Sequence, residues 1–489
     1  MNINNKVSYS LERMINIALD LSAEKDFDML MRKILLEAMD ICRCDAGTVY
    51  LLEDEHLHFH TMFTKSKGIP APGERKKADL PPVPLKRTHV CACCAMDHRK
   101  INIADIYCSS EYDFKGAQKY DELNGYRTGS MLVIPMSDEK DDIVGVLQLI
   151  NALDEKGNII PFDPGYEEII QALASLAAVS INNHKLAKEI NDLLHSFVQV
   201  MVGAIDTRSP YNATHTRSMV RYGERFLKWL DDNDKGWNLT DDEKDAFIMS
   251  IWLHDIGKLL VPGHILDKPD RLAGIGERIK NRIDIGRLQE RIRALSNPEE
   301  AKLHDEKASE LKKAWDIITS SAAKGYLDDE TVSNLHKCAE MTCADVEDNE
   351  IPLLNDDELH SLTVRRGSLT EEEKAEIEKH VVYTSQMLDK MNFKGVYKGV
   401  PHMAGSHHEF IDGSGYPNEL KGEELSKEVR LITVLDIYDA LTAEDRPYKP
   451  PVAPEKAFSI LYDMCDEGKL DRSIVELFEE SRVYEDNGD

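Results

Sequence analysis

One long segment fixes the layout of this chain. Between Gly165 and Gly203 the sequence contains no glycine or proline, and its apolar residues recur at intervals of three, four or seven, which places them on one side of an α-helix. These residues are Ile169, Leu173, Leu176, Val179, Leu186, Ile190, Leu194, Phe197 and Met201. We therefore expect a connecting helix over residues 166–205, an N-terminal domain over residues 1–165 and a C-terminal domain over residues 206–489.

The apolar stripe of this helix is longer than a simple linker requires. A stripe of that extent suits pairing with the same helix of a second chain, so we expect a homodimer with parallel helices. Packing against the chain's own two domains is the alternative. At 489 residues the chain is also too long for one ordinary core, in agreement with several domains.

Charge and composition exclude several classes of partner. The chain has 60 basic and 89 acidic residues, a formal charge of -29, which argues against binding to a nucleic-acid polymer or an anionic membrane. We find no signal-peptide pattern at the N-terminus and no stretch of about 18 to 20 apolar residues, so we expect a cytoplasmic protein. The nine cysteines favour thiols or metal ligands over a disulfide framework.

The N-terminal domain combines helical and strand patterns. Residues 11–42 have helical spacing, whereas residues 47–52, 127–136 and 143–151 are short apolar or alternating runs bounded by turn residues. These patterns predict an α+β domain with a central antiparallel sheet.

Three segments of this domain, AGTVYLL, GYRTGSMLVIPM and IVGVLQLINA, resemble a GAF domain, a module that senses small molecules, over about residues 10–180. GAF domains that bind cyclic nucleotides carry an Asn-Lys pair matched by Phe, three residues and Asp-Glu. Here Ala152 stands at the Lys position and Tyr166 at the Asp position, beside Asn151, Phe162 and Glu167. The resemblance therefore implies the fold without cyclic-nucleotide binding, and the GAF ligand is left open.

A cluster of soft side chains is unusual for such a domain. Cys91, Cys93 and Cys94 lie between His89 and His98. At this spacing they could hold zinc, a haem iron or an iron–sulfur cluster, or could sense oxidants. The alternative is a set of small buried thiols near a ligand pocket.

The C-terminal half has a helical pattern and carries the chemistry-bearing residues. His254-Asp255 ends a buried apolar run, and Asp436 lies inside another, where an ionisable side chain is costly unless it is coordinated. Lys258 follows Asp255 by three residues and lies on the same helical face. A second pair, His407-His408, precedes a Gly415-Tyr416-Pro417 turn.

This combination resembles the HD-GYP phosphodiesterases, metal-dependent hydrolases of cyclic dinucleotides, from about residue 200 onward. The resemblance implies an all-α domain and hydrolysis of cyclic di-GMP to pGpG, with further cleavage to GMP left open. It implies a metal-ligand set that comprises His215, His254, Asp255, His380, His407, His408 and Asp436. Asp255 would bridge two divalent ions and act in catalysis with Lys258, which would also contact the substrate phosphate.

The same resemblance implies roles for two further segments. Arg446 and Lys449 match the substrate-binding segment of the family. The loop around Gly415-Tyr416-Pro417 is expected to be rigid and to offer a docking surface for a partner of the diguanylate cyclase type.

The number and identity of the metals are less constrained. Residues 209–215 read SPYNATH where the family has Asp-Pro-Tyr-Thr-x-Gly-His, so a third ion remains an open alternative, with Asp206 as a candidate carboxylate. Imidazole and carboxylate ligands favour iron or manganese, with zinc as the alternative.

Residues 273–365 form a predicted helical insertion, with amphipathic helices over residues 281–311 and 328–344. The insertion either covers the active site or only adds surface. Its His336, Cys338 and Cys343 are better explained by packing than by metal binding.

Two alternatives to a cyclic di-GMP phosphodiesterase remain at this point. One is a catalytically weak receptor that binds the dinucleotide and signals through partners. The other is a hydrolase of another cyclic dinucleotide or of a nucleotide, because substrate choice depends on the shape of the pocket.

Overall fold

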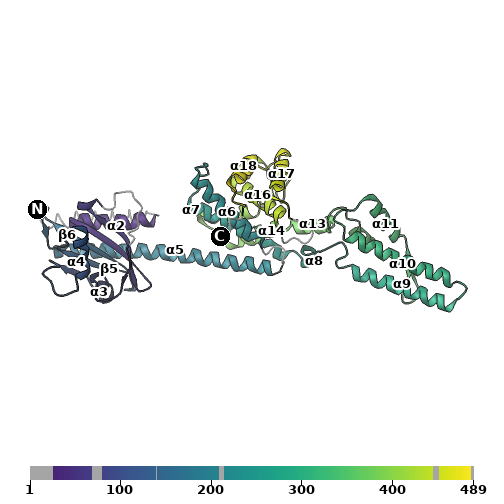
Figure 1. Ribbon diagram of the computed structural model, residues 1–489, viewed down its shortest axis with the longest axis horizontal. Helices are drawn as coiled ribbons and strands as arrows, with labels where there is room; N and C mark the ends of the chain where they lie inside the picture. Colours follow the sequence, from purple (N-terminus) through teal and green to yellow (C-terminus); the bar gives the residue numbers. More distant parts are fainter. Residues whose placement is uncertain (1–25, 69–79, 139, 209–213, 444–450, 486–489) are drawn as a thin grey trace. The chain divides into compact units, whose positions relative to one another are not determined.

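The computed structural model describes residues 26–68, 80–138, 140–208, 214–443 and 451–485 (Figure 1). The chain divides into two compact units, residues 1–193 and 194–489, and helix α5 (Glu167–Arg208) contributes residues to both. The long helix expected from the sequence is thus present.

The first unit is built on one antiparallel sheet with the strand order β3-β2-β1-β6-β5-β4, and β7 pairs with β6. The strands are β1 (Cys44–Glu53), β2 (His56–Thr64), β3 (Val83–Pro84), β4 (Ile101–Ile103), β5 (Met131–Ser137), β6 (Ile143–Leu153) and β7 (Ile159–Ile160). β1 and β6 are central, and Thr48 lies opposite Gln148 in their register. This sheet confirms the predicted α+β architecture.

Helices cover both faces of the sheet because successive strand residues point to opposite sides. Val49 and Leu51 face a core formed with α2 (Phe27–Cys42) and the first turns of α5, whereas Tyr50 faces a core formed with α3 (Val90–Asp97). The other helical segments of this unit are α4 (Lys115–Asn124), η1 (Lys65–Lys67) and η2 (Pro164–Tyr166).

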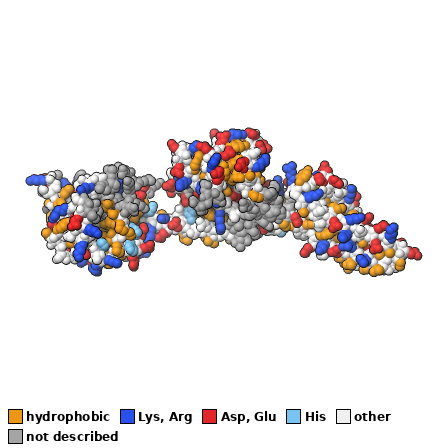
Figure 2. All heavy atoms as spheres, viewed as in Figure 1, with side chains coloured by type: hydrophobic (Ala, Val, Ile, Leu, Met, Phe, Trp, Pro, Cys, Tyr) orange, Lys and Arg blue, Asp and Glu red, His pale blue; other side chains and the backbone are white. Residues whose placement is uncertain are grey.

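The second unit is mostly helical. Its main bundle consists of the end of α5, α6 (His215–Asp232), α7 (Asp241–Leu253), η4 (Ile256–Leu260), α8 (Gly263–Leu266), α13 (Glu371–Glu378), α14 (His380–Leu388), η5 (Asp389–Met391), η6 (Gly395–Gly399), α15 (Val400–Ala404), η7 (Gly422–Glu424), α16 (Lys427–Thr442), α17 (Pro454–Asp466) and α18 (Arg472–Ser481). One core joins α6, α7, α16, α17 and α18, and a second joins α5, α7 and α15. In Figure 2 acidic and basic side chains are interspersed over the visible face of this unit.

Residues 273–365 form an arm with a core of its own. It contains α9 (Gly276–Ser296), α10 (Ala301–Ala322), α11 (Asp329–Ala339), α12 (Asp356–Leu362) and the hairpin of β8 (Thr342–Ala344) with β9 (Glu350–Pro352). Arg271, which is fully buried, holds the base of the arm by donating to the carbonyl oxygens of Val364 and Lys324.

The arm corrects two helix predictions from the sequence. Residues 281–311 do not form one helix, because α9 ends at Ser296 and α10 begins at Ala301, with Pro298 between them. The helix expected over residues 328–344 ends at Ala339, and residues 342–344 form β8 instead. The reason is the turn that follows, where the Asp345 carboxylate accepts hydrogen bonds from the backbone of Glu347 and Asn349. Cys338 and Cys343 are buried in the arm's core, as the packing interpretation expected.

Within the described residues, none of the helices combines the length and the apolar composition that crossing a bilayer requires.

Candidate metal centre

The His254-Asp255 pair lies at a sharp break between two helical segments. The second half of α7 is apolar and mostly buried, and it delivers His254 and Asp255 to the interior, where both are buried. η4 begins immediately afterwards and lies against α14. A Cβ atom on Gly257 would lie 1.9 Å from the His380 carbonyl oxygen, so only glycine permits this close approach.

A buried threonine fixes the same break. The Thr384 hydroxyl donates to the His254 carbonyl oxygen at 2.9 Å and accepts from the Gly257 backbone N–H at 3.0 Å. α14 therefore positions two ligands at once, its own His380 and the neighbouring His254. Nothing in the local sequence around Thr384 indicated this role.

The structure brings all seven predicted ligands together. Two groups have ligand atoms close enough to share an ion: one consists of His215, His254 and Asp255, the other of His380, His407 and His408. The seventh residue, Asp436 on α16, lies between the groups, with Oδ1 3.2 Å from His215 Nε2 and Oδ2 3.5 Å from His408 Nδ1.

Asp255 connects the two groups through its two oxygens. Oδ2 lies 3.2 Å from His254 Nε2 and 3.8 Å from His215 Nε2, whereas Oδ1 lies 3.4 Å from His380 Nε2 and 4.0 Å from His407 Nε2. One carboxylate thus faces a different histidine set with each oxygen. This arrangement is the one that a bridging ligand of a two-metal site needs.

The ring orientations leave nitrogen lone pairs aimed at the centre. Nδ1 of His254, His380 and His407 each lies 2.6–2.7 Å from the carbonyl oxygen three residues earlier in the chain, so Nδ1–H donates to the backbone. Nε2 of each neutral ring then carries the lone pair, the form that binds metals.

These lone pairs provide a test of whether a cation fits. Nε2 of His380 and Nε2 of His407 are 3.3 Å apart in a buried site, and with both Nδ1 atoms donating elsewhere neither can donate to the other. Two acceptors that face each other are unfavourable unless a cation joins them. The donor set of imidazole nitrogens and carboxylate oxygens therefore fits divalent iron, manganese or zinc.

The electrostatics of the two groups support the same conclusion. Burial lowers the pKa of His380 to about 4, and it also lowers the pKa values of His407 and His408, which keeps these rings neutral. Burial would lower the pKa of His215 as well, but hydrogen bonds to Asp436 and Asp439 outweigh it and raise that pKa to about 9. The carboxylates around His215 thus favour positive charge at the centre.

Asp439 was missed by the sequence reasoning. Its Oδ2 accepts a hydrogen bond from His215 Nδ1 at 2.7 Å, and its side chain is buried on α16, one turn after Asp436. It therefore orients His215 in the way that the backbone carbonyls orient the other rings. A second carboxylate three residues after a candidate ligand, in the DIYDA segment, was the available signal.

Asp439→Asn is expected to weaken metal binding by about 10- to 100-fold while the fold is retained, because the amide oxygen can accept the hydrogen bond from His215 but lacks the negative charge that makes the ring a stronger ligand. Metal titration of the chelator-treated protein measures this, with circular dichroism as the check of folding. An unchanged dissociation constant would contradict the orienting role.

Lys258 extends from η4 toward the carboxylate of Asp255. Its Nζ donates to Asp255 Oδ2 at 2.6 Å, and the side chain is partly exposed. A cation that is accessible beside the candidate metal centre can meet an anionic substrate there. Arg446 and Lys449, the other predicted substrate contacts, and Asp206, the side chain considered for a third ion, lie outside the described residues and side chains.

The Gly415-Tyr416-Pro417 turn lies against the centre. The Tyr416 ring is 4.9 Å from the His408 ring, and a Cβ on Gly415 would meet the backbone of His408 and Phe410 within 2.5 Å. Glu409, buried beside His408, accepts from the backbone N–H groups of Asn418 and Leu420 at 2.7 and 3.0 Å. Glu409 therefore fastens this loop, a role that the sequence reasoning did not assign.

The cysteine cluster lies in the first unit, on α3. Cys91, Cys93 and Cys94 are buried, and burial raises their pKa values, to about 12 for Cys91. Thiols with raised pKa values are poor nucleophiles toward oxidants. Neither group of metal-ligand side chains found among the described residues includes them.

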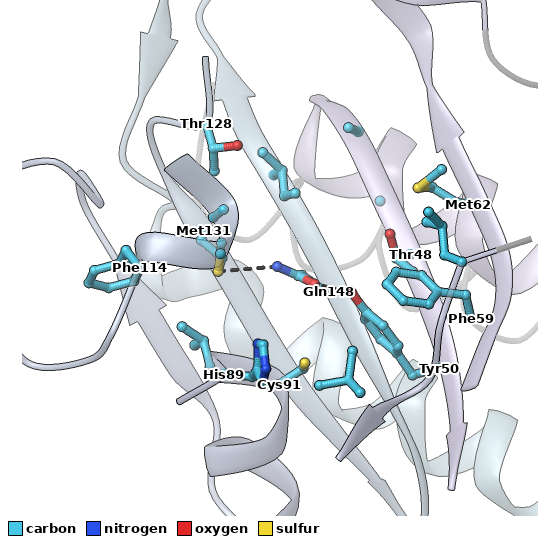
Figure 3. A pocket seen from close by; sticks show the side chains of 18 of the residues that line it. Thr48, Tyr50, Phe59, Met62, His89, Cys91, Phe114, Thr128, Met131 and Gln148 are labelled. Carbon is cyan, nitrogen blue, oxygen red and sulfur yellow. Dashed lines mark hydrogen bonds between the residues drawn. The ribbon is translucent and has the colours of Figure 1, made fainter. Parts of the chain in front are cut away.

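A pocket of about 520 Å³ adjoins this cluster. Figure 3 shows the rings of Tyr50 and Phe59 near the Gln148 amide, with His89 and Cys91 nearby. Gln148 Oε1 accepts from the Tyr50 hydroxyl at 2.9 Å, while its Nε2 lies 3.3 Å from the Met131 sulfur, a weak acceptor. The pocket therefore offers mainly apolar and aromatic walls with one weakly used amide donor.

Comparisons with known proteins agree with these two units. Residues 26–181 match the family model described as GAF domain, and residues 332–474 match the one described as HD domain. The chain thus contains a GAF domain followed by an HD domain. The HD match includes His380, His407, His408 and Asp436, whereas the other three predicted ligands precede it.

Three curated relatives resemble part of the chain. The 3'3'-cGAMP-specific phosphodiesterase 3 of Vibrio cholerae is 43% identical over 95 residues, 19% of this chain and 20% of the relative. The 3'3'-cGAMP-specific phosphodiesterase 2 of the same organism is 34% identical over 24% of this chain and 22% of the relative. The cyclic di-GMP phosphodiesterase response regulator RpfG of Xanthomonas campestris is 35% identical over 21% and 26%. The chain spans about a fifth to a quarter of the length of these relatives.

Proposed function

We propose that this chain is a metal-dependent phosphodiesterase of the HD-GYP type that hydrolyses cyclic di-GMP to pGpG under the control of its GAF domain. The observation that carries the proposal is Asp255, whose two oxygens face two different histidine groups. The names of the relatives, which include cyclic di-GMP phosphodiesterases, support the class of substrate.

The residues divide the work of hydrolysis between them. Two divalent ions held by the seven ligands would supply a hydroxide nucleophile and neutralise charge on the attacked phosphoryl group. Asp255 and Asp436 each contact both histidine groups and so keep them close together. Lys258 offers a positive charge to a nonbridging phosphate oxygen. Arg446 and Lys449 are proposed to hold the substrate. The loop that Glu409 holds in place is proposed to dock a cyclase-type partner.

A second substrate is favoured by a specific observation. The relative with 43% identity is named as specific for 3'3'-cGAMP, another cyclic dinucleotide with two phosphodiester bonds. We therefore keep a 3'3'-cGAMP phosphodiesterase as the alternative to a cyclic di-GMP phosphodiesterase.

One experiment distinguishes a cyclic di-GMP phosphodiesterase, a 3'3'-cGAMP phosphodiesterase and a receptor. The full chain is purified without oxygen, its metals are measured, and turnover of cyclic di-GMP and of 3'3'-cGAMP is compared by chromatography of the products. We expect about two iron or manganese ions per chain and faster conversion of cyclic di-GMP to pGpG. Faster turnover of 3'3'-cGAMP would select the alternative, and tight binding of either dinucleotide without hydrolysis would indicate a receptor.

The GAF pocket supports a proposal about the signal. Lys67 is the only lysine or arginine among the described residues that line it, and its Nζ donates to the Gly125 carbonyl oxygen. A phosphate group would therefore find a single lysine there, and the Asp113 carboxylate in the same lining would repel it. We propose an uncharged, largely aromatic ligand that uses the Gln148 amide and the Thr48 hydroxyl.

The uncharged fluorescent probe N-phenyl-1-naphthylamine tests this pocket on the full chain. We expect its emission to rise on binding, cyclic GMP not to displace it, and Thr48→Phe to abolish the rise by filling the pocket. Thr61→Phe, on β2 and outside the lining, is the matched control. Displacement by cyclic GMP, or a signal unchanged in Thr48→Phe, would contradict the proposed ligand class.

A further inference from the structure

Helix α5 carries two separate apolar faces. One is used inside the chain: Ile170, Leu173, Ala174, Ala177 and Ala178 are buried in the core of the first unit. In the second unit Val198 and Val202 are buried against α7 and α15. The sequence alone could not distinguish these buried residues from the other apolar residues of the helix. Only the structure shows which of them pack against the chain's own domains.

The other face is exposed and has a different period. Seven large apolar residues on it are between 36% and 72% exposed: Leu176, Val179, Leu186, Ile190, Leu193, Phe197 and Val200. Their spacing alternates between three and four residues, with one gap of seven, between Val179 and Leu186, that Asn183 divides into four and three. A strict alternation of three and four is the 3.5-residue repeat of a coiled coil. We call this face the α5 seam, with Asn183 included.

Three residues of the seam favour an identical helix as its partner. In the heptad notation Leu176, Asn183, Ile190 and Phe197 take position a, and Val179, Leu186, Leu193 and Val200 take position d. Ile190 at a is followed by Leu193 at d, the combination that favours two parallel strands, and a single Asn at a fixes the register, because a buried Asn is satisfied best by a second Asn opposite it. Asn183 is exposed in the single chain.

The flanks of the seam are compatible with an identical helix. Positions e and g, which carry the charges that select partners in coiled coils, are Ser175, Ser180, Asn182, Ala187, Glu189, Leu194, Ser196 and Met201. Glu189 is the one charged residue in this set, so a second copy of the same helix meets almost no like charge. The flanks also lack the charges by which a helix of different sequence would be selected.

We propose that the α5 seam forms a parallel, in-register, two-stranded coiled coil with α5 of a second copy of this chain, with the two Asn183 side chains opposite each other. The proposal concerns assembly and is independent of the reaction that the HD domain catalyses. It narrows the expected dimer interface from the whole apolar stripe to the eight positions of the seam.

Sedimentation equilibrium of the full chain tests the interface. We expect a dimer at micromolar concentration, and a monomer for the double variant Ile190→Glu/Leu193→Glu, which places charge at two adjacent seam positions and weakens association by at least about 100-fold. Both residues are exposed in the single chain, so its folding should survive, as circular dichroism will show. Lys188→Glu, at position f on the same helix, is the matched control and should remain dimeric. A monomeric wild-type chain, or a dimeric double variant, would overturn the proposal.

Cross-linking tests the orientation. Under mild oxidation Asn183→Cys is expected to give a disulfide dimer above the background of the wild type, whose Cys108 is exposed, whereas Lys188→Cys is not. An antiparallel seam would instead cross-link a mixture of the Asn183→Cys and Leu193→Cys chains and leave Asn183→Cys alone uncoupled, which would overturn the parallel arrangement. Asn183→Ile should still associate but lose the exclusive dimer, with larger species in the sedimentation profile.

Discussion

Replacing Asp255 by Asn is expected to remove at least one of the two proposed metal ions and to lower turnover of the proposed substrate, cyclic di-GMP, by at least about 10³-fold. The substitution preserves the size of the side chain, so the packing around the α7–η4 break should remain. It removes the negative charge that faces both histidine groups, and it places an amide NH₂ where one of the two carboxylate oxygens was. An amide nitrogen does not bind a divalent ion, so bridging is lost even if one ion stays.

Metal analysis and turnover, measured on the same purified sample, check this expectation. The control is Glu358→Gln, which neutralises another buried carboxylate of the second unit, one that pairs with Arg282 in the arm at 2.7 Å. That variant should lose thermal stability but keep its metals. If Asp255→Asn retained the metal content of the wild type, Asp255 would not be a bridging ligand.

Two of the candidate ligands could be predicted because they depart from their surroundings. A carboxylate within an apolar helical run is costly unless something neutralises it, which made Asp255 and Asp436 visible in the sequence. The resemblance to a family supplied the histidines. The structure adds the geometry that the sequence could not contain, namely that Oδ1 and Oδ2 of Asp255 face different histidine groups.

The supporting residues could not be predicted in the same way, because their roles depend on contacts between distant segments. Asp439 orients His215 across 224 positions of sequence, and Thr384 holds the His254 carbonyl across 130. Gly257 is needed only because the His380 backbone passes so close to it. A short polar or glycine residue has many uses, and only the packing of α14 and α16 on η4 and α6 selects one of them.

Burial also bears on alternatives that the sequence left open. The closely spaced Cys91, Cys93 and Cys94 were compatible with an oxidant sensor, but all three thiols are buried and have raised pKa values. The geometry therefore favours packing beside the pocket. The oxidant sensor stays a prediction from spacing alone, and the pocket is the stronger candidate for the signal-receiving site.

Lys258→Met is expected to have the opposite combination of effects to Asp255→Asn. Turnover should fall by about 10²-fold or more, because one group that stabilises developing charge on the phosphate is removed. Both metals should remain, because an ammonium group is not a metal ligand and Lys258 lies outside the two ligand groups. Lys258→Arg, which keeps the positive charge, is the matched control and should retain part of the activity.

The metal measurement distinguishes two possible roles of Lys258, because the direction in which its charge affects metal affinity is known. Lys258 Nζ lies 2.6 Å from Asp255 Oδ2, so in the wild type its charge would compete with bound ions for that carboxylate. Removing a positive charge beside a cation site should leave metal affinity equal or tighter. Lost turnover with undiminished metal would therefore place Lys258 in charge stabilisation at the substrate. Loss of turnover together with loss of metal would show instead that Lys258 serves mainly to hold Asp255 in position.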